Sequence, residues 1–362
     1  MDSIRQWLSE YISADAPIIG AEQVNERIAA LNELFSNYRN MSPAQFKEAM
    51  TTAHFEDYFA DALSRMFYKD YELATGEWRA YTYQDTAPDF RPVVRLRMTR
   101  PGTLHPRFEK GEAVATNIED SAIEYAVSEY AEQFDVSWQA ILNDDLGKIR
   151  ETPQRMAEAA AYFEDEFVSG LYDNAVTQAT LVAMGPPWSG TGRLTAANLA
   201  IGINAMKQRT DPNGNIMNIR RVHLVIPSIL EIQARTILES ILMAGVATND
   251  KNVLRDFIAG VHVDPHITWS GVDVPWYLFA DPASIPAVSV VRLNGVPGPF
   301  VYKQASNIEM VLGTAPAPFM LGSYATGDVS YTVEDIIGGW NDPTFVGVTD
   351  YRGIYYSSGT TP

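Results

Sequence analysis

The chain has 362 residues, which suits two domains or one elaborate one, and its 46% hydrophobic and 20% charged residues are typical of a globular protein rather than a disordered one. Its 45 acidic side chains outnumber the 27 basic ones, so the formal net charge is -18 and the average surface repels nucleic acid and anionic lipid. The absence of cysteine excludes disulfides and thiolate metal sites.

The amino-terminal residues 1–75 are predicted to be helical. The apolar residues that recur there at the three- and four-residue spacing of one helix face are Val24, Ile28, Leu31 and Phe35. This face is either ordinary core or part of an arm that docks on another subunit, and we expect residues 1–90 to form a helical arm. Because the first residues include acids and no apolar run of signal-peptide kind, we expect a soluble, cytosolic protein.

The next segment, "RPVVRLRMTRPGTLHPRFEK", gathers positive charge in an acidic protein. Its basic residues are Arg91, Arg95, Arg97, Arg100, Arg107 and Lys110, against the single acid Glu109. Apolar and charged residues alternate over 94–99, which predicts a strand with one apolar and one charged face. A second alternating run follows in "SAIEYAVSEYAEQFDVSW", after a loop rich in proline and glycine. The two runs predict a long, protruding hairpin.

The charge map leaves the partner of this hairpin open. Residues 91–110 carry a net charge of +5, and residues 111–180 hold fifteen acids against three basic residues. The hairpin of one copy could therefore lie on the acidic surface of another copy. Pairing within one chain, between solvated surfaces, explains the same pattern equally well.

A long helix is predicted over 153–176, with Thr152 as its N-cap and Pro153 at its first position. The apolar residues that form its continuous stripe include Met156, Phe163, Phe167 and Leu171. The acids Glu164, Asp165 and Glu166 lie within it, and we interpret them as a solvated or partner-facing edge rather than an acid/base pair. The length of the helix suits a central support for the whole subunit.

The break in composition at "AMGPPWSGTGR" is the best internal boundary, after which strands and helices alternate. This mixture predicts an α+β second domain. The glycine-rich "SGTG" lacks the Gly-Lys-Ser/Thr of a phosphate-binding loop and is interpreted as a hinge. The tail of the chain is again extended.

Residues that would carry chemistry are few. His262, Asp264 and His266 would share one face of a strand and could serve as metal ligands, but Pro265 favours a strand end near the surface. His223 is isolated and is interpreted as structural. No nucleophile elbow is present, and we expect no catalytic residue, no cofactor-binding residue and no metal ligand. The protein is therefore predicted to be structural or binding rather than an enzyme.

The order of these parts resembles the major capsid (head) proteins of tailed double-stranded DNA bacteriophages, nearest the Mu-type major head subunit group. The segments that carry the resemblance are "SWQAILNDDLGKIRETPQRMAEAAAYFEDEFVSGL" and "LTAANLAIGINAMKQRTDPNGNIMNIRRVHLVIPSILEIQARTIL". It covers roughly residues 90–355 in order. Relatives with other roles remain open: an encapsulin-like shell around protein cargo would share the fold, and an unrecognised soluble hydrolase is a more distant alternative.

The resemblance implies the Hong Kong 97 type capsid fold, of class α+β. The implied parts are an extended loop at 91–120, a peripheral domain at 121–182 and 327–362 with the long spine helix at 153–176, and an axial domain at 183–326. The implied partners are other copies of the chain, in hexamers and pentamers of an icosahedral shell around double-stranded DNA, together with portal and scaffolding proteins, and decoration proteins as a further option. The implied location is the virion capsid, assembled in the bacterial cytoplasm.

In this family the extended loop lies across a neighbouring subunit. By that resemblance the residues expected to contact acids of the next copy are Arg95, Arg97, Arg100, Arg107 and Lys110. The apolar stripe of the long helix is expected to be buried against strands of the peripheral domain.

Overall fold

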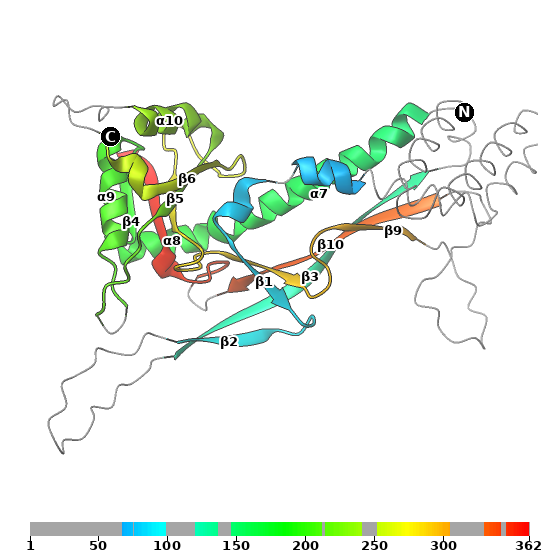
Figure 1. The fold of residues 1–362 in the computed structure, drawn as a ribbon, viewed down its shortest axis with the longest axis horizontal. Helices are drawn as coiled ribbons and strands as arrows, with labels where there is room; N and C mark the ends of the chain where they lie inside the picture. The colour runs from blue at the N-terminus through cyan, green and yellow to red at the C-terminus, as the bar shows by residue number, and fades with distance from the viewer. Residues whose placement is uncertain are drawn as a thin grey trace, which may run out of the picture. The chain divides into compact units, whose positions relative to one another are not determined.

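The computed structural model describes residues 67–74, 76–98, 120–136, 146–211, 214–240, 252–304, 329–341 and 345–361. Figure 1 labels the described helices and strands. The chain forms two compact units. The larger unit contains residues 76–128, 163–297 and 336–362, and the smaller unit contains the rest. These units divide the chain differently from the peripheral and axial domains that the sequence predicts, and that division stays a prediction.

The first sheet has the strand order β1-β8-β10-β3-β2. β1 runs parallel to β8, whereas β8 is antiparallel to β10 and β2 is antiparallel to β3. The bounds of these strands are Tyr83–Ala87 for β1, Ser289–Leu293 for β8, Val329–Asn341 for β10, Asp120–Val136 for β3 and Val93–Met98 for β2. The chain order explains the arrangement, because β2 and β3 are consecutive and form a hairpin.

The second sheet has the order β4-β11-β7-β5-β6, and helices cover both of its faces. Its central strands β5 and β7 read "VHLVI" and "WYLFA" and are buried along their whole length, as expected for strands covered on both sides. The bounds are Ser189–Gly192 for β4, Ile354–Thr361 for β11, Trp276–Ala280 for β7, Val222–Ile226 for β5 and Ile258–Val263 for β6. The glycine-rich segment predicted to be a hinge is therefore strand β4, parallel to β11.

One face of this sheet packs against α9 (Ala196–Lys207) and α10 (Glu231–Glu239), where Leu199, Ile203 and Ile237 join Leu224 and Trp276 in one core. Thr195 caps α9 by accepting a hydrogen bond from the Asn198 N–H. Short 3-10 helices flank these elements, at Glu77–Ala80 (η2), Ser228–Leu230 (η3), Leu254–Phe257 (η4) and Tyr351–Gly353 (η5).

The opposite face packs against the carboxyl-terminal part of α7 (Leu146–Tyr172), α8 (Ala175–Met184) and the first sheet. The helix predicted over 153–176 therefore begins earlier and ends earlier than expected. Asn174 is extended and accepts a hydrogen bond from the Thr177 N–H, so it caps a second helix, α8, where the sequence pattern suggests one continuous stripe.

Two glycines allow one backbone segment to approach another closely. A Cβ atom on Gly338 of β10 would lie 2.2 Å from the Ala126 carbonyl oxygen of β3. Gly347 has a φ of 82°, and a Cβ there would lie 2.2 Å from the Leu171 carbonyl oxygen. Both positions require glycine, since an added methyl group would meet backbone rather than a movable side chain.

The smaller unit is built on the amino-terminal part of α7. Its core contains Ala157 and Ala161 of α7, Val333 of β10, and Phe67 and Tyr71 from the helical residues 67–74. β9 (Phe300–Gln304) pairs antiparallel with the first half of β10.

Among the described residues, no helix is long and apolar enough to cross a membrane.

Candidate assembly site

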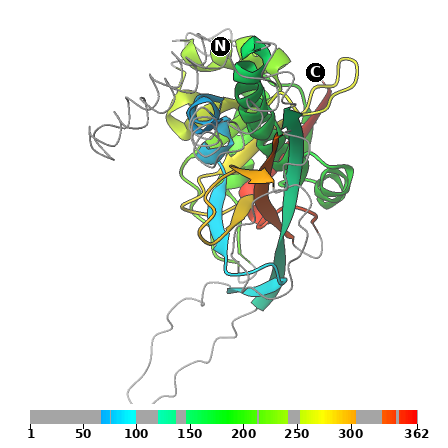
Figure 2. The same cartoon turned by 90° about the vertical axis from the view of Figure 1, so that its right-hand side faces the viewer.

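The predicted hairpin is present as β2 and β3, which Figure 2 shows side by side. Arg95 lies opposite Ile123 in the register, and Arg97 lies opposite Ser121. The other three basic residues predicted to contact a neighbour, Arg100, Arg107 and Lys110, lie outside the described residues. The contact of all five with another copy stays a prediction.

The register shows which face of the hairpin continues the core. Along β3 the side chains of Ile123, Tyr125 and Val127 are buried, and those between them are exposed. Arg95 and Arg97 occupy the register positions that share the face of Ile123, whereas Val94, opposite Glu124, is 60% exposed. The apolar side chain of Val94 is therefore turned to solvent. Alternation alone predicts two different faces, but it does not say which one points toward the core.

The four apolar residues predicted to form the core stripe of the long helix lie on α7. Met156 is partly buried in the smaller unit, against the core that contains Ala157 and Ala161. Phe163, Phe167 and Leu171 are partly buried in the larger unit, against the core between the two sheets. The rings of Phe163 and Phe167 are 6.2 Å apart between centroids.

A buried ion cluster, which the sequence reasoning missed, joins α7 to the first sheet. The Glu164 side chain is fully buried, forms an ion pair with Arg292 of β8, and lies 3.6 Å from a guanidinium nitrogen of Arg79. The interpretation of Glu164 as part of a solvated edge is therefore wrong. Its spacing from the buried residues Ala161 and Val168 places it on the inner face of the helix, which is the sequence signal that could have found it.

The neighbouring Asp165 is held close to the backbone of η2. A Cβ on Gly76 would fall 1.8 Å from an Asp165 carboxylate oxygen, so a larger residue there would force the Asp165 side chain to move. Burial raises the pKa of Asp165 to about 7, helped by the negative charges of Asp264 and Glu164 and opposed by Arg79. This carboxyl group changes its charge near neutral pH.

The three residues considered as metal ligands are separated in the structure. β6 ends at Val263, and the buried Asp264 carboxylate accepts hydrogen bonds from the hydroxyls of Ser169 and Tyr172 and from the His266 N–H. His262 instead faces His223 on β5. In the described part of the chain, no group of three histidine or acidic side chains could hold a metal ion.

Three polar side chains lie in a row at the edge of the second sheet, in the order His223, His262 and Glu77. The Nδ1 atom of His223 is 3.0 Å from Nε2 of His262, and Nδ1 of His262 is 3.3 Å from a Glu77 carboxylate oxygen. Burial lowers the pKa of both imidazoles, and the facing ring lowers that of His223 further, while Asp281 and Glu77 act in the opposite direction on His223 and His262 respectively.

These lowered values predict that acid destabilises the protein. In the unfolded chain the two histidines bind protons near pH 6.5, whereas in the folded chain their pKa values are lower. The stability that is present above pH 6.5 should therefore be lost as the pH falls through these lower pKa values. Urea unfolding from about pH 7.5 to about pH 5.5 should show this loss, and the double variant His223→Phe, His262→Phe should show less of it. An unchanged pH slope in the variant would refute the assignment to this pair.

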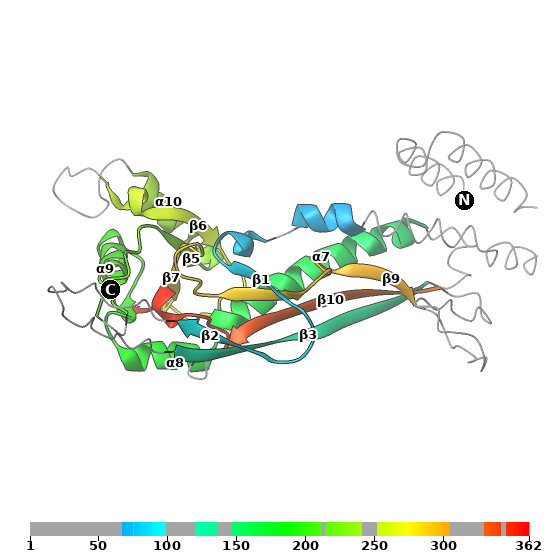
Figure 3. The same cartoon turned by 60° about the horizontal axis from the view of Figure 1, so that its bottom comes forward.

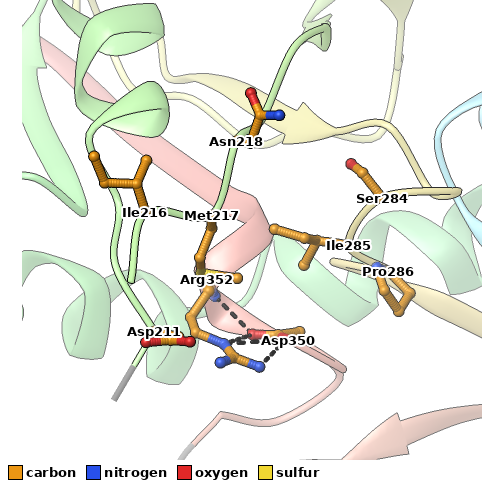
Figure 4. Close-up of a pocket in the computed structure, with 9 residues that line it drawn as sticks. All are labelled: Asp211, Ile216, Met217, Asn218, Ser284, Ile285, Pro286, Asp350 and Arg352. Atoms are coloured by element: carbon orange, nitrogen blue, oxygen red, sulfur yellow. Dashed lines mark hydrogen bonds and ion pairs between the residues drawn. The ribbon is translucent and has the colours of Figure 1, made fainter. Parts of the chain in front are cut away.

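The larger unit also contains a pocket of about 320 Å³, drawn in Figure 4. Several of its polar groups are already engaged: Arg352 donates to both carboxylate oxygens of Asp350, and the Ser284 hydroxyl donates to the Asp281 carbonyl. The residues that line it are Asp211, Ile216, Met217, Asn218, Ser284, Ile285, Pro286, Asp350 and Arg352. The pocket thus holds neither a nucleophile beside a base nor an open ligand set.

Residues 120–357 match a family described as phage capsid protein. The chain belongs to this family. No curated protein matches the sequence. The match begins at β3 and includes α7, α8 and both sheets, so it covers the hairpin's second strand and the elements that anchor it. The nearer likeness to the Mu-type group stays a prediction.

Solved structures similar to this chain include two from phages and one of an encapsulin complex. The capsid of Myoviridae phage XM1 has a TM-score of 0.46 at 10% identity, over 78% of this chain and 91% of that one. Mycobacterium phage Adephagia has a TM-score of 0.46 at 11% identity, over 76% and 87%. The SrpI encapsulin complex of Synechococcus elongatus PCC 7942 has a TM-score of 0.47 at 11% identity, over 80% and 89%.

The family match decides between the roles that the sequence leaves open. The protein is a structural major capsid protein of a phage head, with a mixed α+β fold of the Hong Kong 97 type. Its place is the virion capsid. The residues described above fit this role, since their ion pairs and hydrogen bonds join helices to sheets rather than assembling a reactive site.

Proposed function

We propose that this phage capsid protein assembles with copies of itself, as hexamers and pentamers, into the icosahedral shell that encloses double-stranded DNA, and that it has no enzymatic activity. The observation that carries the proposal is the family match over residues 120–357. Its other partners are portal and scaffolding proteins, with decoration proteins as a further option. Assembly takes place in the bacterial cytoplasm. The net charge of -18 suits a wall that must not hold the packaged DNA tightly.

Within this shell, residues 91–120 act as the extended loop, 121–182 and 327–362 as the peripheral domain, and 183–326 as the axial domain. The hairpin register supports the first of these assignments, because β2 and β3 pair up to Met98 and Asp120 and so mark the base of the loop. Arg95 and Arg97 at this base, with Arg100, Arg107 and Lys110 beyond it, contact acids of an adjacent copy. Each ion pair between copies contributes only about 0.2 to 1 kcal/mol, but the contact repeats around a closed shell.

Reversing the charge of Arg95 and Arg97 to glutamate should leave the subunit folded and stop shell formation at low salt. The acids of two copies would then repel each other, and high salt should restore some shells by screening. Shell yield by sedimentation, together with circular dichroism of the unassembled protein, measures both effects.

The matched control is the double reversal Arg220→Glu, Arg221→Glu, because both side chains are exposed and lie outside the hairpin. This control should change the net charge by the same amount and leave shell yield unaffected. If the hairpin variant unfolds as a monomer, the arginines lie inside the subunit. If it assembles normally at low salt, the charge of the hairpin is merely solvated.

A further inference from the structure

The outer face of α8 is apolar along its whole length. Its exposed residues are Ala175, Val176, Ala179, Val182, Ala183 and Met184, and we call them the α8 stripe. Val176 is 55% exposed and Val182 is 51% exposed, while Thr177 and Leu181 on the inner face are buried. A helix that is apolar on both faces is normally buried on both, but within the described part of the chain this face of α8, which is labelled in Figure 3, is exposed.

The chain segment that contains the stripe is free of charge. Residues 174–192 contain no acidic or basic side chain, in a chain whose net charge is -18. Two copies of so acidic a protein repel each other over most of their surface, and an uncharged face is where they can approach at least cost. This favours a second copy of the chain over a basic partner, which would be drawn to the acidic surfaces elsewhere.

The size of the stripe also points to a contact within a shell. A ten-residue helix is about 15 Å long, and one face of it is far smaller than the roughly 800 Å² per partner of a stable complex. Such a face cannot hold a separate dimer together. It can add to a closed assembly in which other contacts already hold each copy in place.

The pattern of side chains fits a symmetric contact. Ala175, Ala179 and Ala183 recur every four residues along the middle of the stripe, with Val176 and Val182 on either side. Small residues in one row let two helices approach closely, and the larger side chains of each can then fill the groove of the other. Because the same row is present in every copy, a two-fold contact would bring two rows of small residues together.

We infer that the α8 stripe is a two-fold contact between copies of this chain, with α8 of one copy packed on α8 of another and Ala179 next to the axis. The inference rests on the proposed shell function and adds to it a site outside the basic hairpin. The contact takes no other ligand.

Charge at position 179 gives the most direct test, because a two-fold axis brings this position of one copy next to the same position of the other. Ala179 is exposed on a helix, and glutamate and lysine are good helix formers, so both variants should fold. Ala179→Glu alone and Ala179→Lys alone should each lower shell yield at least about tenfold, since like charges meet. A mixture of the two variants should recover shells, because opposite charges then meet.

A cysteine at the same position gives an independent readout, since the natural chain has no cysteine. Shells of Ala179→Cys, treated with a mild oxidant, should yield disulfide-linked dimers. Ala197→Cys, at an exposed position on α9, is the matched control and should yield few. Packing on small residues brings facing Cα atoms to about 6 Å, within disulfide range.

The outcomes separate this inference from the shell function. If the natural chain forms no shells, the proposed function fails. If it forms shells and Ala179→Glu does so equally well, or if the two charged variants do not rescue each other, the two-fold contact is wrong and the function stands. Equal cross-linking at positions 179 and 197 would overturn the contact as well.

Discussion

Replacing Arg292 with methionine should lower the free energy of unfolding by about 3 to 5 kcal/mol, because it leaves a buried carboxylate without its closest partner. Glu164 is fully buried and forms its ion pair with Arg292, and the remaining cation, Arg79, is 3.6 Å away on a side chain that is 39% exposed. The variant keeps most of the volume of the side chain, so the loss reports on charge rather than on packing. Urea unfolding of the unassembled chain measures it.

The control is the exposed ion pair between Arg235 and Glu231 on α10, whose side chains are 57% and 38% exposed. Arg235→Met should cost less than about 1 kcal/mol. The double variant Glu164→Leu, Arg292→Met should recover much of the stability that Arg292→Met alone loses, because no buried charge remains. An equal effect of the two single variants would contradict the buried-charge account.

Replacing both Phe163 and Phe167 with alanine is the other change with a large expected effect. Each ring packs against the core between the two sheets, and each loss should cost about 3 kcal/mol, the low end for a phenylalanine because both side chains are only partly buried. The two rings lie close enough to interact, so the double variant need not equal the sum of the singles. Thermal unfolding of the three variants gives the comparison.

Tyr162 provides the control within the same helix, because its side chain is 60% exposed. Tyr162→Ala should change the unfolding temperature far less than either phenylalanine variant. Unchanged stability of the double phenylalanine variant would show that the apolar stripe of α7 does not support the larger unit.

Elements with strong periodicity could be predicted from the sequence. The alternation at Ile123, Tyr125 and Val127 predicts one buried face of β3, and the structure confirms it. The prediction of one helix over 153–176 is only partly right. The apolar stripe continues past Asn174, where one helix has ended and the next is capped. A cap depends on local hydrogen bonds, which a hydrophobic stripe does not reveal.

The parts of the site that depend on tertiary contacts could not be predicted. Glu164 looks like one of three surface acids until Arg292, far along the chain, is placed beside it. His223 and His262 are likewise separated in sequence and meet because β5 and β6 are neighbouring parallel strands. The α8 stripe shows the opposite case, since apolar residues that predict burial are exposed in the single chain.

The central claim, that this phage capsid protein forms a shell in which the basic hairpin lies on a neighbouring copy, is tested most directly by electron cryomicroscopy of the purified full chain. We predict closed shells, or rings of five and six copies, with residues 91–120 of each copy lying across the next one. A well-folded monomer at every salt and protein concentration, or a shell in which the hairpin folds back on its own subunit, would contradict the claim.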